Sequence, residues 1–488
     1  MPFTLPADLP PPRPPMSCVV PTAMAAGWAR PEYANAIVST KRPIKVHWDD
    51  TFTQEDAEAV IAQAEHAWSV QVDEIGFRAP VLPDGFHGDE LDIYMSKTEG
   101  SWIGWTYPDE KNDTVPNDGS FGVSSYILLG DIPADWMASY VAHEFNHVTQ
   151  YATDASEWTY PIWESVATAA QKWTVGEQDY RFEMQSFQIA PWAPTFMAYS
   201  DRLTTIEPDA WAFEYGGVIW VHYIDEILGN GDGKNAAALW EAVANDGFSY
   251  EKDVLDGITE IVGDLGVAMN GVALTRFLVG ADWDARGIED LAVWDNDEMK
   301  VPIAHTLSPT ELPQDLTFEM GPMVMGTSYT DINTNGENQR LIAGVQSESG
   351  LVSAIIAFWW DENGDVGQVE ASGLNPTVSL SLRNLRRVVV AVSNMGPEDF
   401  DCDWDNKFIK GDQVLKLSSE DLPTTSTTTT STETSETTTP PPQDTSAPHN
   451  DSEQSCGCTS NQPTGSFALT ILPLLAFLRR RSDANHVL

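Results

Sequence analysis

Basic residues are scarce in this sequence of 488 residues. Lys and Arg number 26 against 73 Asp and Glu, which gives a formal net charge of -47. Proteins that bind nucleic acids gather Lys and Arg along the phosphate backbone, and anionic membrane surfaces attract the same side chains. The composition therefore excludes nucleic acid as an expected partner and predicts no contact of the folded domains with a membrane. Such acidity is typical of a protein kept soluble outside the cell.

Cysteine is also rare, with four residues at Cys18, Cys402, Cys456 and Cys458. So few cysteines exclude a dense disulfide framework. Cys456 and Cys458 stand in a tail, where a zinc ribbon is not expected. A disulfide between Cys18 and Cys402 is compatible with an exported protein, and the sequence leaves that pairing open.

Long apolar runs are missing as well. The run at 467–478 holds about a dozen residues, whereas a membrane-spanning helix needs about 20. It follows Cys456-Gly457-Cys458 and precedes Arg479-Arg480-Arg481, an order that makes sense as a C-terminal sorting signal. Residues 1–39 are rich in proline and contain no clear signal peptide. We nevertheless predict a secreted or cell-surface protein, held at the outer membrane only through its tail.

The order of predicted strands and helices along the chain indicates an α+β protein. Half-buried strands such as Ile44–Trp48 alternate with amphipathic helices in the first half. After about residue 315, short β-branched runs separated by Asn, Gly and Asp predict a small all-β sandwich. A later Thr/Ser/Pro tract cannot bury apolar surface and is expected to be disordered. The predicted boundaries are 1–39 for an irregular arm, 40–312 for a mixed-sheet domain with a helical C-terminal subdomain, 313–417 for the sandwich, 418–455 for the disordered linker and 456–488 for the sorting tail.

Three helices in the first domain have clear signatures. Thr53 and Asp56 form a capping box before apolar residues that recur at helical spacing up to Ile75. A second helix is predicted from about 134 to 151, after the Gly130-Asp131 turn. A third, at 211–228, is apolar nearly all round and is therefore expected to be buried.

The helix predicted at 134–151 carries the sequence His143-Glu144-Phe145-Asn146-His147. Successive helical residues are 100° apart, so His143 and His147 project from one face and can hold one tetrahedral metal. Zinc lowers the pKa of its bound water to about 7, and Glu144 beside it can take a proton and pass it to a leaving amine. Two unrelated histidines on an exposed face are the alternative, but Glu144 interrupts an otherwise apolar stripe, which favours the metal site.

The third ligand decides the class of site. A metzincin needs Gly at 150 and His or Asp at 153, and this chain has Gln150 and Thr153. A glutamate from a following helix is the other common solution, with Glu157 and Glu164 as candidates. Glu164 is favoured because it lies in the first turn of a helix that begins near Pro161, whereas Glu157 lies in the connecting turn.

These two helices resemble those of gluzincin-type zinc peptidases, and most closely those of secreted metalloproteases of myxobacteria. Such proteins pair a His-Glu-Phe-x-His helix with a Trp-x-Glu-Gly-x-Ala helix, and this chain has Trp163-Glu164-Ser165-Val166-Ala167. The resemblance covers roughly residues 40–290, and the tail independently resembles a myxobacterial sorting signal. It implies a zincin-like fold that binds Zn²⁺ through His143, His147 and Glu164, with Glu144 as the general base.

Two positions of this chain differ from the pattern of the family, and one further region resembles it. Ser165 replaces the usual Gly, and Thr168 stands where thermolysin-like members place an Asp that orients a ligand histidine. Many gluzincins stabilise the oxyanion with a downstream Tyr, and Tyr215 in Phe213-Glu214-Tyr215-Gly216-Gly217 resembles that region; a core tyrosine is the equal alternative. His222 is expected to be a core histidine, and Asp232 to belong to a plain turn.

The sequence thus predicts a monomeric zinc metallopeptidase that cleaves extracellular proteins or peptides, as an endopeptidase or an aminopeptidase. The alternative is a non-catalytic, surface-displayed binding protein whose zinc site is structural or vestigial. A structural zinc site usually has four protein ligands, whereas a catalytic one keeps an open position. Three ligands together with Glu144 favour the enzyme.

Overall fold

The computed structural model describes most of the chain between residues 30 and 423. The described residues are 30–83, 88–97, 104–109, 122–155, 157, 160–176, 181–195, 213, 215–244, 252–293, 299–319, 321–398, 400 and 411–423. The predicted sorting tail, most of the predicted linker, and both Cys18 and Cys402 lie outside these residues.

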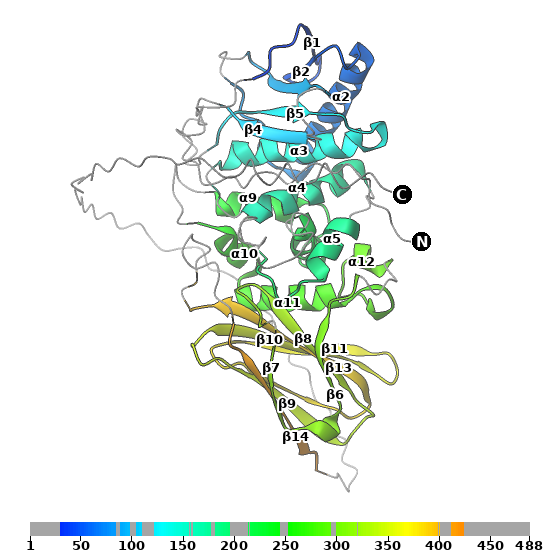
Figure 1. Cartoon of the computed structure of the whole chain (residues 1–488), viewed down its shortest axis with the longest axis vertical. Coiled ribbons are helices and arrows are strands. Elements are labelled where there is room, and N and C mark those ends of the chain that lie inside the picture. The colour runs from blue at the N-terminus through cyan, green and yellow to red at the C-terminus, as the bar shows by residue number, and fades with distance from the viewer. Residues whose placement is uncertain are drawn as a thin grey trace, which may run out of the picture. The chain divides into compact units, whose positions relative to one another are not determined.

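The N-terminal part of the chain forms a mixed five-stranded sheet (Figure 1). Its three middle strands run parallel, and an antiparallel strand pairs at each edge. The order across the sheet is β1-β2-β3-β5-β4, so β4 is an edge strand. The strands are β1 (Asn35–Val38), β2 (Ile44–Trp48), β3 (Leu91–Met95), β4 (Gly104–Pro108) and β5 (Ser125–Leu129).

Helices α2 (Gln54–Ala67) and α3 (Met137–Thr153) pack against this sheet. The predicted capping box is confirmed, because the Thr53 side chain accepts the Asp56 N–H while the Asp56 carboxylate accepts the Thr53 N–H. Apolar residues of both helices join those of the central strands in one core. The α+β class is therefore confirmed for this part of the chain.

The helix predicted to reach Ile75 changes its winding at Trp68, where the π-helix η1 (Trp68–Ile75) begins. Its Gln71 side chain is fully buried. Gln71 Nε2 donates to the Ala142 carbonyl at 2.8 Å and lies 3.0 Å from Thr174 Oγ1. One amide therefore ties α3 to the end of the next helix, α4 (Tyr160–Val175).

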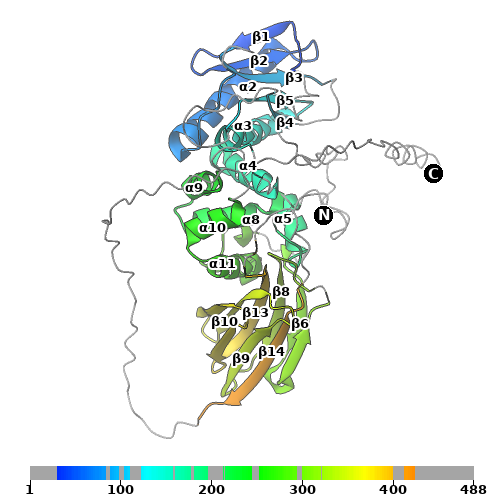
Figure 2. The same ribbon diagram turned by 90° about the vertical axis from the view of Figure 1, so that its left-hand side faces the viewer.

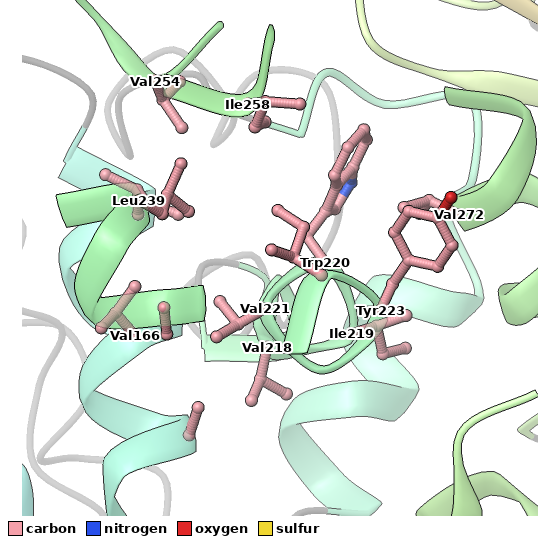
Figure 3. Packing of buried hydrophobic residues seen from close by; sticks show 14 of the residues in the cluster. Val166, Val218, Ile219, Trp220, Val221, Tyr223, Leu239, Val254, Ile258 and Val272 are labelled. Carbon is pink, nitrogen blue, oxygen red and sulfur yellow. The ribbon is translucent and has the colours of Figure 1, made fainter. Parts of the chain in front are cut away.

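The next part of the chain is helical. Figure 3 shows its core, where Val166 of α4 lies near Val218 and Val221, and Tyr223 lies beside Val272. The helix predicted at 211–228 is divided, because a short α8 passes directly into the π-helix η3. The remaining elements are α5 (Arg181–Gln188), α8 (Val218–His222), η3 (Tyr223–Ile227), α9 (Lys234–Val243), α10 (Val254–Val262), α11 (Leu265–Phe277) and α12 (Glu289–Ala292).

No single helix among the described residues is long and apolar enough to cross a membrane. The pair α10 and α11 reaches that length and composition only when combined, and it is bent by 90° at its break. Residues of both helices belong to the buried apolar core of the helical part.

The last described part is a two-sheet β-sandwich (Figure 2). One sheet has the order β11-β10-β13-β8-β6 and the other β12-β9-β14-β7, and apolar side chains of both fill the space between them. The strands are β6 (Ile303–Leu307), β7 (Gln314–Thr317), β8 (Thr327–Asn333), β9 (Gln339–Gln346), β10 (Val352–Asp361), β11 (Val366–Gly373), β12 (Thr377–Ser381), β13 (Leu385–Gly396) and β14 (Val414–Asp421).

Regular structure extends past three of the boundaries drawn from the sequence. Strand β1 lies inside 1–39, because its backbone pairs with β2. Strand β6 lies before residue 313, because it pairs in parallel with β8. Strand β14 continues into 418–455 as far as Asp421, because it pairs with β9 over its whole length. The partners of β6 and β14 are distant in sequence, so local composition gave no sign of them, whereas β1 pairs with β2, the next strand along the chain.

The end of the N-terminal arm is fixed by a buried ion-pair network. The Arg30 guanidinium donates to both carboxylate oxygens of Asp109, at 2.8 and 2.6 Å, and also pairs with Asp92. His47 Nε2 lies 2.8 Å from the other oxygen of Asp92. Buried arginine is stable when its donors are satisfied in this way, so residue 30 already belongs to the folded domain.

Candidate metal centre

Helix α3 brings His143 and His147 together on one face. The two ring centroids are 4.8 Å apart, and the Nε2 atoms face each other at 3.1 Å. Only 5% of His143 and 2% of His147 is exposed to solvent. One turn of helix fixes this spacing, so it depends on little besides α3 itself.

Glu164 joins the two histidines from α4, which packs along α3. Its Oε2 atom lies 3.0 Å from His143 Nε2 and 3.5 Å from His147 Nε2, and the residue is fully buried. Three tetrahedral ligands at about 2.05 Å from a zinc ion stand about 3.3 Å apart. The three separations bracket that value, so these residues fit a zinc ion.

The charges of the three residues also fit a dication. Burial lowers the pKa of His143 below its usual value, and this outweighs the opposing effect of Glu164. The neutral imidazole that results is the form that binds metals. A bound dication would supply a countercharge to a carboxylate buried between two imidazoles.

Gln150 orients His147. Its Oε1 lies 2.6 Å from His147 Nδ1, and its Nε2 donates to the Trp163 carbonyl at 3.0 Å. Because that amide is held by Trp163, its oxygen accepts the Nδ1–H and leaves the His147 Nε2 lone pair for the metal. The sequence reasoning missed this residue, although its position three residues after His147 on the same helix was the available signal.

Glu144 lies against β4. Thr106 Oγ1 is 2.8 Å from Glu144 Oε2 and 2.9 Å from the Glu144 carbonyl oxygen, so its hydroxyl donates to one of them at a time. A Cβ at Gly104 would stand 2.7 Å from Glu144 Oε1 and 3.0 Å from Cγ. Only glycine leaves room there for the carboxylate. Neither Gly104 nor Thr106 is near Glu144 in sequence, and the sequence reasoning found neither.

Tyr215 lies beside the three-ligand cluster, and Glu157 is not part of it. The Tyr215 ring stacks on His143 with centroids 5.8 Å apart and 29° between the planes. The Glu157 carbonyl accepts the Trp163 indole N–H at 3.3 Å. Of the two candidate glutamates, the fold brings Glu164 to the histidines.

The departures noted at Ser165 and Thr168 leave both residues buried inside α4. Thr168 Oγ1 donates to the Glu164 carbonyl at 2.7 Å, one turn back along the helix. Thr168 therefore does not orient a histidine, and Gln150 of α3 does so instead.

The comparisons with known proteins give little help with this site. No family model matches the chain, and no curated protein matches it. One similar solved structure is CorA, a surface-associated copper-binding protein of Methylomicrobium album BG8, with 11% identity and a TM-score of 0.17 over 24% of this chain and 98% of that one. Another is the pre-peptidase C-terminal domain of a Bacillus anthracis collagenase, with 13% identity and a TM-score of 0.15 over 24% and 97%. A third is a family GH115 4-O-methyl-α-glucuronidase, with 10% identity and a TM-score of 0.13 over 71% and 54%. Likenesses this weak carry no argument about fold or activity.

Proposed function

We propose that this protein is a zinc-dependent peptidase built on a zincin-like domain of the gluzincin type. The observation that carries the proposal is the convergence of His143, His147 and Glu164, with Glu144 next to His143 on the same helix. Three protein ligands leave a fourth tetrahedral position open, as hydrolytic zinc sites require. A zinc ion bound there supplies a Lewis acid and lowers the pKa of water to about 7.

The residues of the chain take the remaining roles. Glu144 accepts a proton from the attacking water and returns it to the amine as the C–N bond breaks. Thr106 holds one oxygen of that carboxylate, which fixes the orientation of the other. Tyr215, stacked on His143, is the proposed donor to the oxygen of the scissile carbonyl.

A peptide is the substrate class that β4 fits best. This strand pairs with β5 on one side, and within the described residues no strand pairs with its other side. An extended peptide can add to an edge strand through main-chain hydrogen bonds. Because Gly104 and Thr106 of β4 touch Glu144, a peptide along this edge would pass close to the general base.

The test compares metal content with peptide cleavage in matched variants. Glu144→Gln should keep the zinc and lose hydrolysis, because an amide has the same shape and cannot take the proton. Glu164→Gln should lose most of the zinc, whereas Glu157→Gln should keep it. Tyr215→Phe should keep the zinc and lower turnover by about 100-fold.

Other results would contradict these assignments. Full activity in Glu144→Gln would remove the catalytic assignment, and zinc lost from Glu157→Gln alone would move the third ligand. A wild-type protein that binds zinc and cleaves no peptide would favour the non-catalytic binding protein. Export and surface anchoring stay predictions, because the residues that motivate them lie outside those described.

A further inference from the structure

A second group of potential metal ligands lies where α8, η3 and α12 meet. His222 ends α8, Glu226 follows one turn later in η3, and Asp290 belongs to α12. One ligand atom from each lies within 4.8 Å of the other two. The group shares no residue with the site on α3 and α4.

His222 is the unusual member. It is fully buried, and neither of its ring nitrogens has a hydrogen-bond partner. Nδ1 lies 3.2 Å from Glu226 Oε1 and Nε2 lies 3.7 Å from Asp290 Oδ2, without hydrogen-bond geometry. A buried imidazole with both nitrogens unpaired costs free energy unless something uses its lone pair. A carboxylate oxygen lies near each ring nitrogen, so the nitrogen that carries the lone pair has one beside it in either tautomer.

Lys172 of α4 is the cation that holds these carboxylates together. Its Nζ donates to Glu226 Oε1 at 2.8 Å and to Asp290 Oδ2 at 2.9 Å. Burial lowers the pKa of Lys172, but the two carboxylates outweigh that effect and the pKa is raised, so the ammonium stays charged. Within the described part of the chain, one ammonium against two carboxylates leaves one negative charge uncompensated beside His222, whose pKa is lowered by burial.

We propose that His222, Glu226 and Asp290 form a second site, for a divalent transition-metal ion, and that the Lys172 ammonium fills it when no ion is bound. One imidazole nitrogen and two carboxylate oxygens suit Mn²⁺, Co²⁺ or Zn²⁺. A dication balances the charge of both carboxylates and binds the lone pair of His222. The Lys172 ammonium carries only one charge and does not pair with His222.

The site is open enough for this exchange. The side chains of Lys172, Glu226 and Asp290 are 23%, 16% and 23% exposed. Lys172 carries its charge on a flexible four-carbon stem, so the ammonium can turn into solvent when an ion enters. A bound ion would then fasten η3 to α12.

The experiment counts metal bound by the full-length protein. Wild-type protein is first loaded with one equivalent of Zn²⁺ and then titrated with Co²⁺, with calorimetry and visible absorption as readouts. Lys172→Met removes the competing charge and should lower the dissociation constant of the second metal ion at least about tenfold. Lys234→Met is the matched control, because it removes an equally positive side chain that pairs only with exposed Asp232 among the contacts described here.

His222→Gln and Asp290→Asn, each made alone, should abolish the second equivalent and keep the first. Glu164→Gln should lose the first equivalent and keep the second, so failure of the peptidase proposal would be seen separately. The proposal is overturned if His222→Gln and Asp290→Asn both retain the second equivalent. It is also overturned if wild type and Lys172→Met bind only one, which is the result expected of a purely structural ion pair. If Lys172→Met does not fold, the His222 and Asp290 variants decide the matter.

Discussion

At the scale of single residues, Gln150 decides how well His147 can serve as a ligand. Its two hydrogen bonds join His147 Nδ1 to the Trp163 carbonyl, next to Glu164 in the chain. The same amide thus fixes a ring on α3 relative to the first turn of α4. Partners of this kind set both the tautomer and the direction of a ligand histidine.

Gln150→Leu should therefore weaken zinc binding about 10- to 100-fold with little change in the fold. Leucine fills nearly the same space and offers no acceptor to His147. Gln171→Leu is the control, because Gln171 also makes a hydrogen bond between α4 and α3, to Ser139, but away from the ligands. Competition with a chromogenic chelator measures the affinity, and equal affinities in the two variants would contradict the role of Gln150.

A different residue, Asp225, should make stability depend on pH. It is fully buried, and burial raises its pKa, although the Gly233 N–H that it accepts at 2.8 Å opposes the shift. The pKa of an Asp carboxyl in the unfolded chain is about 3.9. Because the pKa of Asp225 is higher in the folded state, its contribution to stability is complete below the unfolded pKa and is lost as the pH rises through the folded pKa. Ionised Asp225 therefore disfavours the fold at neutral pH.

Asp225→Asn should raise the melting temperature at pH 7, and the gain should shrink as the pH falls toward about 4. The asparagine keeps an oxygen for Gly233 and carries no charge. Asp232→Asn should give no such gain, because Asp232 is exposed and its hydrogen bond to Lys234 lowers its pKa. A gain for Asp225→Asn that grows in acid would show that the sign is wrong.

At the scale of elements, the site depends on the close approach of β4 to α3. Glu144 is 1% exposed and touches β4 at Gly104 and Thr106. The strand is held in place by antiparallel pairing with β5, which itself belongs to the sheet packed on α3. The proposed general base, Glu144, is thus positioned by a strand whose own position depends on the whole sheet.

Gly104→Ala should lower peptide cleavage at least about tenfold and leave zinc content unchanged. The new methyl group must displace either the Glu144 carboxylate or the strand, because the three atoms nearest to it all belong to the Glu144 side chain. Gly344→Ala in the sandwich is the control, since its Cβ would meet a movable Thr377 hydroxyl at 3.0 Å. Activity in Gly104→Ala equal to that of the control would show that β4 can move without consequence.

At the scale of the whole molecule, the sandwich shares a core with the helical part. Residues of α11, among them Ala273 and Phe277, pack with Tyr329, Ile356 and Phe358 of the sandwich. Tyr329 also donates its hydroxyl to the Ala273 carbonyl at 2.9 Å. The described residues between 30 and 423 belong to one compact unit that includes this contact.

C-terminal truncations should show which segments the fold depends on. A chain that ends at residue 424 should keep the melting temperature and zinc content of the full chain. A chain that ends at residue 417 should melt at a lower temperature, because it loses the pairing of Ser418–Asp421 with β9. A chain that ends before β6 should lose solubility, since it exposes the apolar face of α11. Thermal melts and soluble yield measure these effects, and equal melting of the 417 and 424 chains would contradict them.

Local geometry explains what the sequence determined by itself. The spacing of His143, Glu144 and His147 follows from helical rotation once α3 forms, and the capping box at Thr53 follows from four neighbouring residues. Strand β2 likewise follows from its local pattern and was predicted at its observed bounds. These features need only contacts between residues close in the chain.

Tertiary structure alone decided the features that join distant segments. The sequence favoured Glu164 over Glu157, but the closeness of Glu164 to the histidines comes from the packing of α4 on α3. Gly104 and Thr106 reach Glu144 from about 40 residues away, and Asp290 reaches His222 from 68 residues away (290 − 222). Such contacts depend on how helices and sheets close on one another, which is set by the combined burial of many apolar side chains and not by any local pattern.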